Sequence, residues 1–148
     1  MSTIQINGAD FYYERAGSGP PVVLLHAGIA DSRMWDRQFD AFVAAGHTVL
    51  RYDQRGYGRT APVSGSFIPR EDLRVMLKAL GIARPSLVGC SMGSRNAPAF
   101  ALRYPTKVDR LGPTPPSGTQ FRHPGDPSPP PAPTQTAPLT PLTPPDRQ

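Results

Sequence analysis

The sequence GCSMG at residues 89–93 constrains the fold more than any other stretch of this chain. It follows the apolar run 86–88 and leads into a segment of helical character. Small residues at Gly89 and Gly93, two positions before and two after Ser91, allow neighbouring backbones to pass close to a tight strand-to-helix turn. The pattern predicts that Ser91 projects from this turn, above a sheet and at the positive end of the following helix.

Strand patterns precede this turn along the chain. Two alternating segments flank the dipeptide NG at positions 7 and 8, which favours a tight turn and predicts an antiparallel hairpin. Continuous apolar runs are typical of strands that are covered on both faces. The expected strands are residues 3–6, 11–15, 22–25, 48–52 and 86–88.

Helical spacing of apolar side chains alternates with these strands. The spacing predicts helices over 34–45, 70–80 and 92–104, with a loop rich in Gly, Pro and Ser over 53–65. Pro98 lies inside the third helix, where it costs about 3 kcal/mol, so that helix is either kinked or begins near Asn96. The expected fold class is therefore α/β, a mostly parallel sheet with an N-terminal antiparallel hairpin and flanking helices.

Composition divides the 148 residues into two parts. Residues 1–112 contain seven of the 20 prolines and 14 of the 16 basic residues, whereas 113–148 contain 13 prolines and few apolar side chains. We expect the first part to be the folded domain, and the second to be a disordered or polyproline-like tail. Several P-x-x-P spacings in the tail allow a partner of the SH3 type, although so much proline produces such spacings easily.

Charge and cysteine content exclude several classes of protein. The net charge of +5 comes from scattered arginines without a dense cluster, which argues against nucleic-acid binding. Cys90 is the single cysteine, so an intrachain disulfide is impossible. We find no secretory signal and no apolar run of membrane-spanning length, so we expect a cytoplasmic protein without membrane contact.

Four segments in order resemble the α/β-hydrolase family. The resemblance covers about residues 3–111 and rests on LLHAG with a tryptophan after it, YDQRGYG, LVGCSMG and YPTKV, which begin at residues 24, 52, 87 and 104. The chain departs from the family pattern at Ala27, where a glycine is usual, and at Pro98. The resemblance implies a truncated α/β-hydrolase fold, a small acyl substrate, and no cofactor or metal.

The resemblance also assigns roles to individual residues. Ser91 would be the nucleophile, and the backbone N–H groups of Met92 and Gly28 would form the oxyanion hole, which stabilises the charged oxygen of a tetrahedral intermediate. Glycine at position 28 would leave room for a substrate carbonyl. His26 would orient the end of its strand rather than act as a base, with Gly89 and Gly93 supporting the turn.

Several residues also have a purely structural interpretation. Trp35 either lines a substrate pocket or packs in the core with Phe39, since the two share a helical phase. Asp53 and Arg55 are expected to fix a loop, and His47 to be exposed.

The acid and base of a triad are missing after Ser91. In this fold they follow the serine in the chain, and the order Ser91…Asp109…His123 has an unconvincing geometry, because Asp109 is expected at the opposite sheet edge. Without a base, kcat falls on the order of 10⁶-fold, so we expect weak or no activity. Esterase, lactonase, thioesterase and cofactor-free peroxidase activities all stay open, while Ser91 disfavours a haloalkane dehalogenase, which has an aspartate there.

The apolar pattern stops abruptly at Gly112, where another central strand is expected and prolines follow instead. One hypothesis is a reading frame lost near residue 112. Leu87 and Val88 would then lie on an unprotected sheet edge and favour aggregation. The alternative function is a non-catalytic fragment or pseudoenzyme that binds partners through its proline-rich tail.

Overall fold

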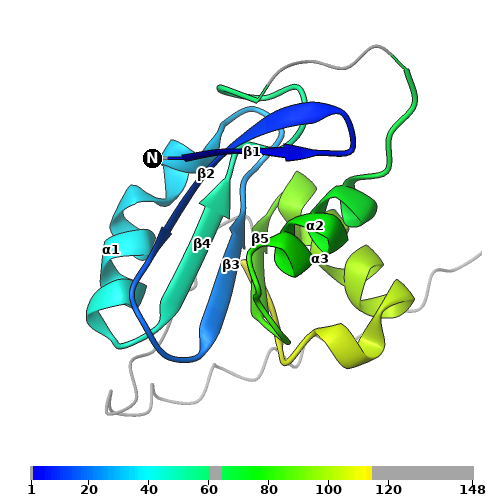
Figure 1. The fold of residues 1–148 in the computed structure, drawn as a ribbon. Helices are drawn as coiled ribbons and strands as arrows, with labels where there is room; N and C mark the ends of the chain where they lie inside the picture. The colour runs from blue at the N-terminus through cyan, green and yellow to red at the C-terminus, as the bar shows by residue number, and fades with distance from the viewer. Residues whose placement is uncertain (1, 61–64, 115–148) are drawn as a thin grey trace, which may run out of the picture.

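The computed structural model describes residues 2–60 and 65–114, which form one six-stranded sheet with helices on both faces (Figure 1). The strands are β1 (Ser2–Ile6), β2 (Ala9–Ala16), β3 (Pro21–Leu25), β4 (Thr48–Tyr52), β5 (Ser86–Cys90) and β6 (Leu111–Thr114). The helices are α1 (Asp36–Ala44), α2 (Pro69–Ala79) and α3 (Met92–Arg103), with 3-10 turns η1 (Ser32–Trp35) and η2 (Pro105–Lys107). The α/β class predicted from the sequence is confirmed.

The strand order is β1-β2-β4-β3-β5-β6. The β1–β2 hairpin is antiparallel and joins the sheet through an antiparallel β2–β4 pair, whereas β4, β3, β5 and β6 are parallel. The parallel strands therefore end at one edge of the sheet, where β5 leads into the turn at Ser91. This edge is where open α/β sheets place their ligands.

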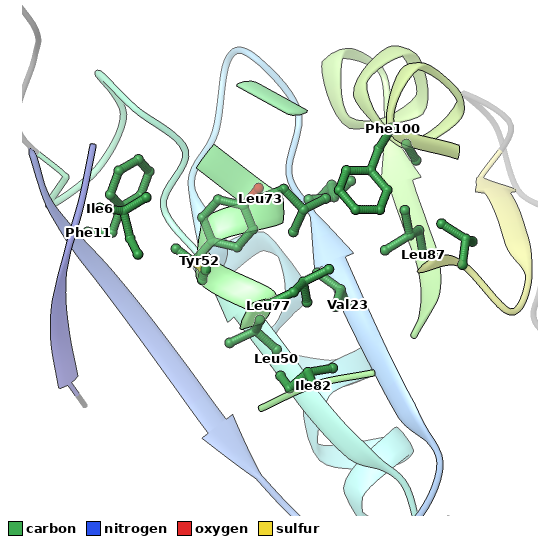
Figure 2. Close-up of a cluster of buried hydrophobic side chains, with 14 of the residues drawn as sticks. Ile6, Phe11, Val23, Leu50, Tyr52, Leu73, Leu77, Ile82, Leu87 and Phe100 are labelled. Atoms are coloured by element: carbon green, nitrogen blue, oxygen red, sulfur yellow. The ribbon is translucent and has the colours of Figure 1, made fainter. Parts of the chain in front are cut away.

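Two apolar layers hold the helices to the sheet. On the face covered by α2 and α3, the larger cluster includes Phe11, Leu73, Met76 and Phe100, all at most 1% exposed (Figure 2). On the face covered by α1, Trp35 and Phe39 pack on β3, β4 and β5. Helices on both faces explain why the parallel strands are almost continuously apolar.

The helix ends differ from the sequence prediction in informative ways. The helix predicted from residue 34 begins as the 3-10 turn η1, because the Asp31 side chain accepts a hydrogen bond from the Arg33 amide and caps this turn. The helix expected over 92–104 runs from Met92 to Arg103 with Pro98 inside it, so the alternative of a start near Asn96 is wrong. The exposed side of α3 accommodates the Pro98 ring.

The edge of the sheet also corrects an expectation. Leu87 and Val88 do not lie on an open edge, because β6 pairs with β5 in parallel register, Leu87 with Leu111 and Val88 with Gly112. The strand extends two residues beyond the boundary expected at 112 and includes Pro113. The remaining 34 residues of the expected tail, with its P-x-x-P spacings, lie outside the described residues.

Proline fits β6 because of the direction in which its nitrogen points. The Leu87 amide donates to the Arg110 carbonyl at 2.8 Å, and bonds in a parallel ladder recur every second residue. Gly112 and Thr114 therefore face β5, whereas the backbone groups of Leu111 and Pro113 face away from it. The missing N–H of Pro113 thus falls on the outer side of an edge strand, where proline is tolerated.

Candidate active site

Ser91 has the strained backbone that the GCSMG sequence predicts. Its φ of 49° and ψ of −106° are unusual for a non-glycine residue, and such strain costs of order 1–3 kcal/mol. The residue follows the last residue of β5, precedes the first residue of α3 and is exposed. The turn therefore presents the Ser91 side chain at the carboxyl edge of the sheet, beside the positive end of α3.

The two glycines of the turn are required by close backbone contacts. A Cβ on Gly89 would lie 2.3 Å from the carbonyl carbon and oxygen of Gly93, and a Cβ on Gly93 would lie 2.1 Å from the Leu25 carbonyl oxygen. Both distances are too short for any real contact. The hydroxyl of Ser94 further secures the turn by donating to the Gly89 carbonyl at 2.7 Å.

Gly28 lies next to the Met92 side chain. An added Cβ on Gly28 would be 3.5 Å from Met92 Sδ and 3.6 Å from Met92 Cβ. These are ordinary contacts, so the backbone itself does not require glycine at this position. The amide of Met92 begins α3 and has no intrahelical partner.

His26 is fully buried, and both of its ring nitrogens are engaged. Nε2 accepts a hydrogen bond from the Gln54 amide at 2.8 Å, so Nδ1 carries the proton and donates to the Ala27 carbonyl at 2.8 Å. Burial lowers the pKa of His26 and keeps the ring neutral. This geometry suits the orienting role expected for His26 and leaves the ring without a lone pair for a substrate.

Asp53 and Arg55 fix the loop after β4. Asp53 is fully buried and accepts hydrogen bonds from the amides of Ser32 and Arg59, both at 2.8 Å. Arg55 donates to both carboxylate oxygens of Asp72 at 2.7 Å. Both residues therefore act as loop anchors.

Trp35 belongs to the core rather than to the site. It is 3% exposed and packs with Phe39 on the α1 face of the sheet, so the core alternative fits and the substrate-binding interpretation of Trp35 loses its support. Cys90 is half-buried against the same cluster.

Among residues 2–60 and 65–114, no histidine is placed to serve Ser91 as a base. His26 is engaged, and His47 precedes β4 at the amino edge of the sheet, where its Nδ1 contacts the Pro20 carbonyl at 3.1 Å. Asp109 lies at that same distant edge, since its amide donates to the Pro85 carbonyl at 3.0 Å. His123 lies outside the described residues.

Two residues of the site were missed by sequence reasoning. Gln54 and Asn96 are joined by a hydrogen bond of 2.7 Å between side chains 42 positions apart. Gln54 stands in a segment predicted only as loop, and Asn96 was considered only as a helix start. The one feature of the sequence that could have indicated this pair is the polar side chain of Asn96 at an inward-facing position of α3.

The matches with known proteins agree with this fold. A sequence model of the alpha/beta hydrolase fold matches residues 20–130. The chain therefore belongs to the alpha/beta hydrolase family. The match begins before β3 and continues beyond the described residues.

Individual relatives are similar over the same region. A putative non-heme chloroperoxidase from Synechocystis sp. is 31% identical over 114 residues, which cover 72% of this chain and 41% of the relative. A 2-hydroxy-6-oxononadienedioate/2-hydroxy-6-oxononatrienedioate hydrolase from Paraburkholderia phymatum is 38% identical over 108 residues, 68% of this chain and 38% of the relative. An epoxide hydrolase from Vigna radiata superposes with a TM-score of 0.72 at 25% identity, covering 76% of this chain and 37% of that structure.

The aligned part of the chain thus spans about two fifths of the length of the curated relatives that it matches. No helix among the described residues is long and apolar enough to cross a membrane.

Proposed function

We propose that this chain carries the nucleophile of a serine hydrolase that acts on a small ester, lactone or other acyl compound. The observation that carries the proposal is the Ser91 turn, with its strained backbone and its exposed serine, and with Gly28 next to the Met92 side chain. In the proposed reaction, Ser91 Oγ attacks the substrate carbonyl carbon and an acyl-enzyme forms as the leaving group departs. Water then hydrolyses the acyl-enzyme.

The proposed oxyanion hole follows from the same arrangement. Two backbone N–H groups directed at one oxygen stabilise its developing negative charge, and each is worth roughly 2.7–4 kcal/mol of barrier. Met92 supplies the first amide of α3, and Gly28 supplies one from the loop after β3. Membership of the hydrolase family supports this assignment, and the names of the relatives, a chloroperoxidase and two different hydrolases, do not select one substrate.

A second candidate function is a non-catalytic member of the family. It is favoured by one specific observation, that neither His26 nor His47 in the described part of the chain reaches Ser91. A serine without a base is a poor nucleophile, and the protein would then act by binding, through residues 113–148 or another surface.

A fluorophosphonate probe tests the choice, because it labels only serines that are activated. Labelling of the full chain that disappears in Ser91→Ala and persists in the exposed-serine control Ser66→Ala supports the hydrolase. Absence of labelling favours the non-catalytic candidate. Loss of labelling in His123→Ala as well would identify the base outside the described residues.

A further inference from the structure

Gln54 connects three parts of the site through its backbone and side chain. Its amide donates to His26 Nε2 at 2.8 Å, and its side-chain Nε2 donates to the His26 carbonyl at 3.0 Å. Its side-chain Oε1 accepts from Asn96 Nδ2 at 2.7 Å. Gln54 is only 5% exposed, so these bonds form in surroundings where an unpaired amide is costly.

At one end, this series of hydrogen bonds reaches the loop that contains Gly28. His26 Nδ1 donates to the Ala27 carbonyl, and the same carbonyl accepts from the Ala30 amide at 3.1 Å. Ala27 to Ala30 is therefore a turn, with Gly28 in its first central position. Because Gln54 holds both the ring and the carbonyl of His26, it fixes the residue that directly precedes this turn.

At its other end, the same series of hydrogen bonds reaches Asn96 on α3. Asn96 lies four residues after Met92, so the two residues share one face of the helix. Both line a cavity of about 130 Å³ together with Gln54. Beside this cavity, the hydrogen bond between Gln54 and Asn96 joins the loop after β4 directly to α3.

We infer that Gln54 and Asn96 are positioning residues that fix the Gly28 amide relative to the Met92 amide. The inference rests on the proposed function, in which these amides form the oxyanion hole. Such a hole depends on donors 2.7–3.1 Å from the developing oxyanion, and a displacement of about 1 Å from a remote change can cost about 10²-fold in rate. Asn96 acts only through Gln54 and touches no substrate.

The test replaces the serine by a nucleophile that needs no base. In a Cys90→Ala/Ser91→Cys protein of full length, the thiolate at position 91 attacks the carbonyl carbon of 4-nitrophenyl acetate, forms a thioester and expels 4-nitrophenolate through an oxyanion intermediate. Iodoacetamide alkylates the same thiolate by displacing iodide, without an oxyanion. The rate with 4-nitrophenyl acetate divided by the rate with iodoacetamide therefore measures how well the oxyanion hole stabilises the intermediate. Differences in the fraction or the accessibility of the thiolate affect both rates equally and cancel.

We expect the ratio of the 4-nitrophenyl acetate rate to the iodoacetamide rate to be higher for the parent protein than for glutathione. Asn96→Ala should lower this ratio by about tenfold or more. The loss should stay below the roughly 10²–10³-fold cost of deleting an oxyanion-hole donor. Gln54→Ala should lower it too, and Gln54→Ala/Asn96→Ala should match Gln54→Ala alone, because Asn96 acts through Gln54. The control Gln38→Ala, an exposed amide on α1, should leave the ratio within about twofold of the parent protein. Alkylation rates should stay nearly constant throughout.

The outcomes separate the two proposals. A ratio in Asn96→Ala equal to that of the parent protein overturns the positioning role while leaving the oxyanion hole intact. A parent ratio no higher than that of glutathione overturns the oxyanion hole, and the positioning role with it. If circular dichroism shows that Asn96→Ala does not fold, Asn96→Asp replaces it, because a carboxylate facing Gln54 Oε1 breaks the same connection without changing the side-chain shape.

Discussion

Gly93 packs directly against the carbonyl oxygen of Leu25, so that the first turn of α3 rests on the end of β3. An added Cβ at position 93 would lie 2.1 Å from that oxygen and 2.7 Å from its carbon. Both partners are backbone atoms, which cannot rotate away. This contact fixes the height of α3 above the sheet and therefore the position of Ser91.

Gly93→Ala is expected to destabilise the fold by about 1–3 kcal/mol or more, because the clash forces α3 away from β3. Urea denaturation of the two proteins measures the difference. Gly28→Ala is the matched control for stability, since its Cβ would make contacts of 3.5 Å and should change the free energy of unfolding little. Equal stability of Gly93→Ala and the unmodified chain would contradict the close contact.

The buried ion pair between Arg55 and Asp72 supports a second prediction. The two side chains are 3% and 4% exposed and anchor the loop after β4 to α2. Asp72→Asn leaves the guanidinium buried without its counter-charge and should cost about 3–5 kcal/mol. The pair of Arg33 with Asp31 provides the comparison, because the Arg33 side chain is 71% exposed and Arg33→Gln should cost far less than Asp72→Asn. Chemical denaturation of both variants checks the contrast.

His26 predicts a pH dependence of stability. Burial lowers its pKa below the ordinary value of 6.5, so the folded ring stays neutral where the unfolded ring takes up a proton. Below about pH 6.5 the unfolded state therefore binds more protons, and stability falls as the pH decreases. The decline ends once the pH passes below the lowered pKa of the folded state.

Unfolding free energies at pH 7.5 and pH 5.5 measure this effect. His26→Gln removes the titrating group, so the variant should be less stable at pH 7.5 but should lose less stability between the two pH values. His47, which is half-buried rather than exposed as the sequence suggested, is the control, and His47→Gln should keep the full pH dependence. An NMR titration showing that His26 protonates at pH 6.5 or above would disprove the explanation.

Short sequence patterns predict most of the fold, because the structure that each pattern favours locally is the one that the folded chain adopts. The alternation of strands and helices, the NG turn and the two glycines around Ser91 are signals that a few neighbouring residues carry. The orienting role of His26 followed from the resemblance, and the loop-fixing roles of Asp53 and Arg55 followed from a structural interpretation of the sequence. The hydrogen bonds of the three residues are compatible with these roles.

The remaining features depend on contacts between distant residues. The pairing of Gln54 with Asn96 depends on how α3 lies against the loop after β4, which no local pattern specifies. The strand β6 was missed because its proline count argues against a central strand, whereas its position at the sheet edge makes Pro113 acceptable.

Pro113 also predicts how the outer edge of β6 behaves. An edge strand with a full set of outward N–H groups is a template for pairing with another chain, and Pro113 removes one of those donors. Pro113→Val restores the donor and adds β-propensity, so it should increase aggregation of the full chain. Light scattering and thioflavin fluorescence at equal concentration measure this, with the exposed Pro98→Ala as the control for loss of a proline outside the strand. Reduced aggregation in Pro113→Val would count against an outward-facing nitrogen.

The strain at Ser91 predicts a conflict between stability and reactivity. Its φ of 49° is accessible to glycine without a Cβ clash, which would relieve about 1–3 kcal/mol, while glycine costs roughly 0.5–1 kcal/mol in backbone entropy. Ser91→Gly should therefore be more stable than Ser91→Ala by about 1 kcal/mol, although both variants lose the hydroxyl. Urea denaturation measures the difference, and Ser94→Gly against Ser94→Ala at a helical position should show the opposite sign. If alanine at position 91 were more stable than glycine by the roughly 0.5–1 kcal/mol of backbone entropy that glycine costs, the turn would hold no strain, and the exposed serine would lose its main structural argument for a catalytic role.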